Sequence, residues 1–233
     1  MRPLVATRGR PAAAVAIAVG AAVAVVLAVI VWHGTTTSFD TWVFERGYSP
    51  LGPQFGCRRR MWLLFSEPVV SILVPIAIVV WAAVTRQRNL AVFAAVGPLV
   101  ALGVTELIGK PLVDRLLGPG VLRGSTAGAV SGAYPSGHET GLVSWLLVGL
   151  LVVFRQTGSV RWRVAALVVA VVWAVLGAFG LTMNYYHYAT DTIGAMGLTV
   201  AVVLGVALLF DRYTAARGRV GCGGSGRQLT WRS

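Results

Sequence analysis

In YPSGHETGLVSWLLVGLLVVF, residues 134–154, a polar corner leads directly into an apolar run. Pro135 stops a preceding helix and Ser136 is a favourable N-cap, so a helix is expected to begin at His138. No charged residue follows Glu139 up to residue 154. The stretch therefore predicts a helix that enters a membrane just behind a polar turn.

Five further apolar runs lie at about 12–32, 62–84, 89–108, 164–182 and 191–210. Hydrophobic residues make up 56% of the 233-residue chain and charged residues 12%, which is too apolar for a soluble domain. A helix of roughly 20 residues crosses a hydrocarbon core. We predict an all-α polytopic membrane protein with six transmembrane helices in a bundle over 12–210. A cytoplasmic segment, 1–11, precedes it, and a disordered cytoplasmic tail, 211–233, follows.

The formal net charge of +12 comes from arginines at the ends of the apolar runs, so it predicts orientation in the cell membrane and no nucleic-acid partner. With both termini cytoplasmic, most of the 20 lysines and arginines lie inside. The run Arg58–Arg60 is an exception on the outside, interpreted as a contact with lipid phosphates. Cys57 and Cys222 then lie on opposite faces, which predicts no disulfide bond between them.

Two basic residues follow the third run. Lys110 is the only lysine of the chain and comes one turn after Glu106. It is either an anion ligand or the partner of Glu106 in a helix-stabilising pair. Arg115 carries the planar guanidinium best suited to binding phosphate, although Asp114 is an alternative partner for it.

The polar corner itself has the properties of an anion site. Ser136, the Gly137 backbone and the first amides of the helix point to one place, where the helix dipole favours negative charge. His138 stands there with an imidazole that can exchange a proton near neutral pH. Glu139 is interpreted as a first-turn acid without a chemical role.

The segment NYYHYATD, residues 184–191, contains His187 and Asp191 at positions i and i+4. The carboxylate can accept the imidazole N–H, fix its tautomer and make the ring a nucleophile. In isolation such a pair is more often an incidental surface contact or a helix cap. The predicted topology, however, brings this segment, the polar corner and Lys110 to the same outer membrane face.

The aromatic-rich segment 34–61 has two interpretations, a segment that lies in the membrane interface and an ordinary loop. No cluster of metal ligands is evident, so neither a metal nor another cofactor is expected.

Together, the Pro-Ser-Gly-His motif at 135–138 and the His-x-x-x-Asp motif at 187–191 resemble those of the type 2 phosphatidic acid phosphatase (PAP2) superfamily. This family includes membrane lipid phosphatases and vanadate-dependent haloperoxidases, and the resemblance covers roughly residues 60–210. It implies that His187 attacks phosphorus to form a phosphohistidine, that Asp191 orients His187, and that His138 protonates the leaving oxygen. Lys110, Arg115, Ser136 and Gly137 would bind the phosphoryl oxygens.

The chain departs from the family pattern at both arginine positions. The first motif has Leu117 where the family has arginine, and Arg115 is the expected substitute. The last motif has Leu181 where the family has a second arginine. Arg123, Asn184 and Tyr185 are the candidate replacement donors.

The resemblance implies a metal-independent phosphatase at the outer face, whose substrate is a lipid phosphate or a polyprenyl pyrophosphate and which contacts membrane lipids. The alternative is a family member without turnover that binds lipid phosphates or serves in assembly. A transporter or scaffold with accidental motifs is disfavoured because few polar residues lie inside the apolar runs.

Overall fold

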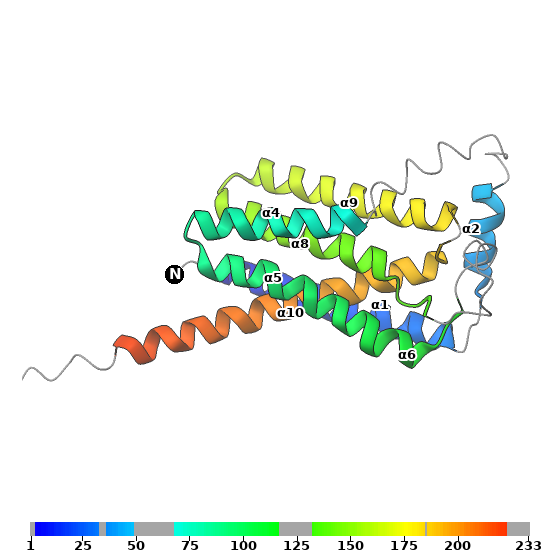
Figure 1. The fold of residues 1–233 in the computed structure, drawn as a ribbon, viewed down its shortest axis with the longest axis horizontal. Helices are drawn as coiled ribbons and strands as arrows, with labels where there is room; N and C mark the ends of the chain where they lie inside the picture. The colour runs from blue at the N-terminus through cyan, green and yellow to red at the C-terminus, as the bar shows by residue number, and fades with distance from the viewer. Residues whose placement is uncertain (1–2, 33–35, 49–67, 117–131, 185, 223–233) are drawn as a thin grey trace, which may run out of the picture.

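The computed structural model describes residues 3–32, 36–48, 68–116, 132–184 and 186–222. Within these ranges every regular element is a helix, which confirms the all-α prediction for the described part of the chain. The long helices run roughly side by side (Figure 1). They are α1 (Arg10–Ile30), α4 (Pro68–Val84), α5 (Arg88–Val104), α8 (Gly137–Gln156), α9 (Val160–Met183) and α10 (Ala189–Cys222).

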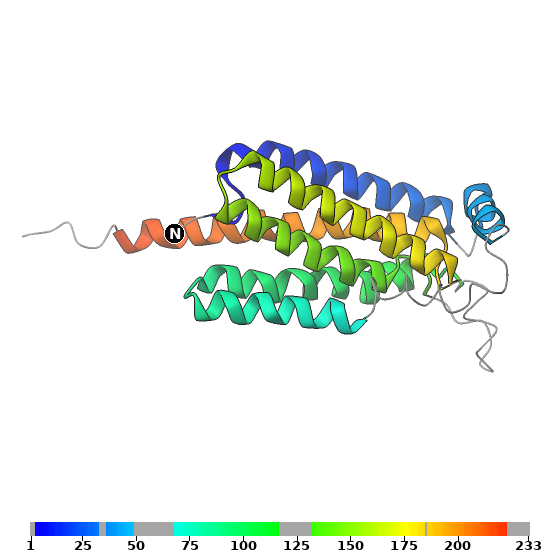
Figure 2. The same cartoon turned by 90° about the horizontal axis from the view of Figure 1, so that it is seen from above.

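Three short elements complete the description. A 3-10 turn, η1 (Thr7–Gly9), precedes α1, while a π-helical turn, η5 (Thr105–Gly109), and α6 (Lys110–Val113) continue α5. The short helix α2 (Ser38–Tyr48) lies across one end of the bundle (Figure 2). We call this end the α2 end.

In the described part of the chain, five helical stretches are long and apolar enough to cross a membrane. They are Thr7–Ile30, Arg88–Val113, Gly137–Gln156, Val160–Met183 and Ala189–Arg217. The predicted span 62–84 is described only from Pro68 onward, and α4 has 17 residues. The structure therefore has a helical bundle with several membrane-length helices. The number of six spans remains a prediction.

Close packing of α1 against α10 holds the first and last helices together. A Cβ atom at Gly20 would lie 2.5 Å from the Gly197 carbonyl oxygen, and one at Gly197 would lie 2.6 Å from that of Gly20. Only glycine permits this approach. The main apolar core lies between α5, α8 and α10, around Leu90, Phe93, Val148, Leu151 and Val203.

Two predicted helix ends are wrong in the same direction. The third helical stretch does not end near residue 108 but continues through η5 and α6 to Val113. The tail predicted to be disordered from 211 begins as helix, because α10 runs to Cys222. Backbone hydrogen bonding continues past the apolar residues in both cases, so hydropathy alone places the ends too early.

Within the segment 34–61, residues 38–48 form the helix α2 and are therefore not an ordinary loop. The interfacial position of this segment stays a prediction. Cys57 and Arg58–Arg60 lie outside the described residues, so the predictions made for them stay predictions.

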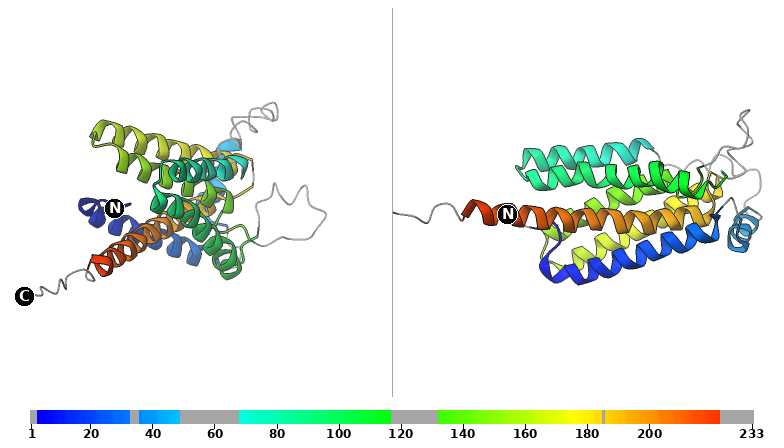
Figure 3. Two further views of the ribbon diagram at one scale, coloured as in Figure 1. Left: turned by 60° about the vertical axis from the view of Figure 1, so that its left-hand side comes forward. Right: turned by 90° about the horizontal axis from the view of Figure 1, so that it is seen from below.

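The two ends of the bundle differ in charge. The end opposite α2 receives the start of α1, the α4–α5 and α8–α9 turns and the far part of α10 (Figure 3). Arginines gather in these elements, at Arg8, Arg10, Arg86, Arg88, Arg155, Arg161, Arg163 and Arg212.

Candidate functional site

The two histidine motifs meet at the α2 end of the bundle, where α8 and α10 both begin (Figure 1). The backbone N–H of Ser136 donates to the Asp191 carbonyl at 3.2 Å, and His187 Nδ1 lies 3.0 Å from the Ala133 carbonyl oxygen. These bonds hold the two segments together. The ring centroids of His138 and His187 are consequently 6.1 Å apart.

The contact of His187 with Ala133 decides its tautomer. A carbonyl oxygen can only accept a hydrogen bond, so Nδ1 carries a proton, and in the neutral ring Nε2 then holds the lone pair. The expected hydrogen bond from His187 to Asp191 is not the one formed, since Asp191 Oδ2 is 3.7 Å from Nδ1. That oxygen accepts the backbone N–H of Tyr188 instead, at 2.9 Å.

Ser136 is the N-cap of α8, as the sequence predicts, and the helix begins one residue earlier than expected. Its Oγ accepts the Glu139 N–H at 3.3 Å, and its carbonyl accepts that of Thr140. Within the described residues the amides of Gly137 and His138 have no partner. They are the donors that a helix start offers to an anion.

Lys110 lies beside this helix start and is paired with Glu106. Its Nζ is 2.7 Å from Glu106 Oε1, and the two side chains are 25% and 45% exposed. A Cβ atom at Gly137 would lie 3.5 Å from Lys110 Nζ and would overlap Glu106 Oε1. Because Gly137 has no side chain, this ion pair can lie directly against the first turn of α8.

Arg115 is fully buried and its guanidinium is bound to carboxylates of the protein. Nη2 donates to Asp40 Oδ2 at 2.8 Å, and Nη1 donates both to Thr190 Oγ1, at 2.7 Å, and to Asp191 Oδ1. The guanidinium carbon also lies 4.2 Å from the Tyr188 ring centroid. Arg115 thus lies at the base of the site and is engaged there by α2 and α10.

Asp40 was not singled out from the sequence, yet it joins α2 to the site. It accepts the backbone N–H and the hydroxyl of Thr190, both at 3.0 Å. Burial raises the pKa of Asp40, but hydrogen bonds from Thr190 and Arg115 outweigh burial and lower it overall. The missed signal is Thr-x-x-Asp at 37–40, where the two residues cap each other reciprocally at the start of α2.

Tyr134, which directly precedes the Pro-Ser-Gly-His motif, anchors this turn to the first helix. Its hydroxyl donates to the Ala24 carbonyl in α1. Burial raises the pKa of Tyr134, which keeps this hydroxyl protonated as a donor. The ring lies against Gly194 of α10, where a Cβ atom would overlap it.

The replacement donors are only partly described. Asn184 Nδ2 donates to the Gly180 carbonyl at 2.7 Å near the end of α9, where Leu181 is buried. Arg123, Tyr185 and Leu117 lie outside the described residues. In the described ranges no three His, Cys, Asp or Glu side chains are placed to hold a metal ion.

The charges form two layers. Buried beneath His187, one guanidinium faces two carboxylates, those of Asp40 and Asp191. Nearer the solvent, Lys110 is matched by Glu106. With one guanidinium against two carboxylates, the buried layer carries one formal net negative charge. The open layer is electrically balanced.

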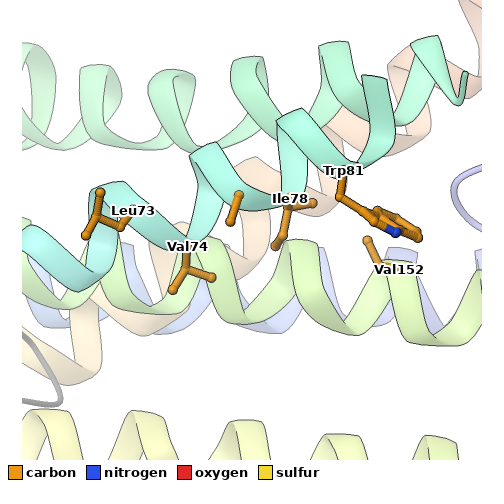
Figure 4. A pocket seen from close by; sticks show the side chains of 6 residues that line it. Leu73, Val74, Ile78, Trp81 and Val152 are labelled. Carbon is orange, nitrogen blue, oxygen red and sulfur yellow. The ribbon is translucent and has the colours of Figure 1, made fainter. Parts of the chain in front are cut away.

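An apolar groove lies elsewhere, between α4 and α8 (Figure 4). Leu73, Val74, Ile78 and Trp81 of α4 line it together with Val152. Val152 is about 21 Å along α8 from His138 at the rise of a regular helix. No residue of the histidine site lines the groove.

Comparisons with protein-family models, with curated proteins and with solved structures find no match for this chain.

Proposed function

We propose that this protein is a membrane phosphatase that hydrolyses a lipid phosphate or a polyprenyl pyrophosphate through a phosphohistidine intermediate. The observation that carries the proposal is the approach of His138 and His187, from segments far apart in the chain, to 6.1 Å between ring centroids. Two imidazoles at this separation can contact one phosphoryl group from opposite sides.

His187 is assigned the role of nucleophile. Its Nδ1 proton is held by the Ala133 carbonyl, which aims the lone pair of Nε2 away from that carbonyl. Attack of Nε2 on phosphorus places positive charge on the ring, and the net negative charge of the buried layer stabilises it. Asp191 acts through this field, since its oxygen is 3.7 Å from Nδ1.

His138 is assigned as the acid that protonates the leaving oxygen and then as the base that activates water. Lys110 and the amides of Gly137 and His138 bind the oxygens of the phosphoryl group, which is where protein groups contribute most to phosphoryl transfer. The hydroxyl of Ser136 is assigned to the same set of phosphate-binding groups.

We place the α2 end at the outer face of the cell membrane. The arginines of the opposite end favour the cytoplasmic side under the positive-inside rule, and both termini then lie inside. The substrate would be drawn from the outer leaflet.

Phosphate release by the purified full chain in detergent tests this function. The protein is expected to release inorganic phosphate from a lipid phosphate without added metal, and His187→Gln should lower kcat by a factor of at least about 10³. Glu45→Gln, an exposed change on α2, is the matched control and should keep activity. Turnover by His187→Gln at the rate of the control would refute the mechanism.

A second candidate is a lipid-phosphate binding or assembly protein without turnover. The engagement of Arg115 by Asp40 and Asp191 favours it, because this arginine cannot bind phosphate while it holds both carboxylates. Binding of lipid phosphates without phosphate release across a panel of headgroups would support this candidate.

A further inference from the structure

The pair formed by Glu106 and Lys110 occupies the place where the proposed function puts the phosphoryl group. Glu106 Oε1 is 2.7 Å from Lys110 Nζ, the chain's single lysine. The same oxygen fills the space that a side chain at Gly137 would take. The carboxylate thus lies against the first turn of α8, where the amides of Gly137 and His138 are without partners in the described chain.

A carboxylate at this point resembles part of a phosphate. It carries negative charge and two oxygens, it accepts from an ammonium, and it faces the positive end of a helix dipole. We propose that Glu106 is a built-in competitor for the anion position and so determines how tightly the site binds phosphate. This inference rests on the proposed function, because it assigns a specificity role at the same site.

The local backbone explains how Glu106 reaches this position. The pair spans η5, a single π-helical turn in which the Lys110 N–H bonds to the Thr105 carbonyl. Pro111 follows at once and has no N–H to give to the turn before it. Such π turns inside longer helices are frequent at functional sites.

Exposure makes the pair displaceable. Glu106 is 45% exposed and Lys110 25%, whereas Arg115, Asp40 and Asp191 are completely buried. A partly exposed ion pair is held weakly because water screens it. An arriving phosphate can therefore take Lys110 from Glu106, but it cannot take Arg115 from its two carboxylates at comparable cost.

The test measures binding of inorganic phosphate to the full chain in detergent by isothermal titration calorimetry, together with KM and kcat for a lipid phosphate. Glu106→Gln keeps the shape and removes the charge, so it should tighten phosphate binding by about two- to fivefold and lower KM by the same factor. Glu106→Asp restores the charge and should bind phosphate less tightly than Glu106→Gln. Glu45→Gln, with the same change in net charge, should change neither quantity.

Two results overturn the inference and are distinguishable. If wild type binds phosphate and Glu106→Gln binds it equally or less tightly, Glu106 merely stabilises its helix, and the proposed function stands. If neither protein binds or releases phosphate at millimolar concentration, the proposed function fails together with the inference.

Discussion

Arg115 forms its ion pairs with residues that are remote in the chain. Its sequence neighbours offer Asp114, but the structure pairs it with Asp40, 75 residues away, and with Asp191. Breaking a buried ion pair leaves an uncompensated charge, and such changes cost several kcal/mol. Arg115, Asp40 and Thr190 therefore fix the base of the site before any ligand arrives.

Asp40→Asn tests this network through its pH dependence. The folded-state pKa of Asp40 is lowered, so its stabilising contribution is present above the unfolded-state pKa of about 4 and is lost as pH falls through the folded-state value. At neutral pH the variant should lose about 1–3 kcal/mol of unfolding free energy. Thermal unfolding in detergent between about pH 3 and pH 7 measures both effects.

The acid limb distinguishes this explanation from a general effect of acid. Wild type and the exposed variant Glu45→Gln should lose stability together in acid, while Asp40→Asn should show a flatter profile. Parallel profiles for all three proteins would mean that Asp40 contributes no charge-dependent stability.

Among residues, those at helix starts were predictable from sequence motifs, whereas those that act across helices were not. Ser136 as N-cap follows from its neighbours alone. The Ala133 carbonyl as partner of His187 does not, because any residue type presents a carbonyl and the contact spans 54 positions. Asp40 had a local signal in Thr37, but that signal predicts a helix start and not a partner for Arg115.

At the scale of elements, the helices were predictable where apolar residues continue and less so where they stop. The runs correspond to α1, α5, α8, α9 and α10, since burying or embedding these faces requires them to be apolar. The helix α2 was missed because its mean hydropathy is low, and its position comes from polar contacts to α10.

The crossing of α1 and α10 yields a prediction about packing. Gly197→Ala should destabilise the protein by about 1–3 kcal/mol, because the added methyl group meets the Gly20 carbonyl oxygen. Gly205→Ala in the same helix meets open space and should be neutral or slightly stabilising, as alanine favours helix. Thermal unfolding of the two variants side by side measures the difference. Equal stabilities would contradict the close crossing.

For the whole molecule, the arrangement separates a basic end from an end that carries the histidines. The helices are joined so that the starts of α8 and α10 and the extension of α5 come to the same end (Figure 1). Counting apolar runs anticipates this arrangement, because successive spans alternate in direction. The charge balance within the site is a property of the folded whole, since it needs Arg115 in contact with Asp40 of α2 and Asp191 of α10.

The central claim is that His187 and His138 act on one phosphoryl group. The most direct measurement is mass spectrometry of the purified protein, quenched in alkali during turnover of a lipid phosphate, with peptides mapped for phosphorylation. We predict a phosphoryl group on the peptide containing His187, and accumulation of this species in His138→Gln, which lacks the base for its hydrolysis. Release of phosphate by wild type with no phosphorylated His187 in either protein would contradict it.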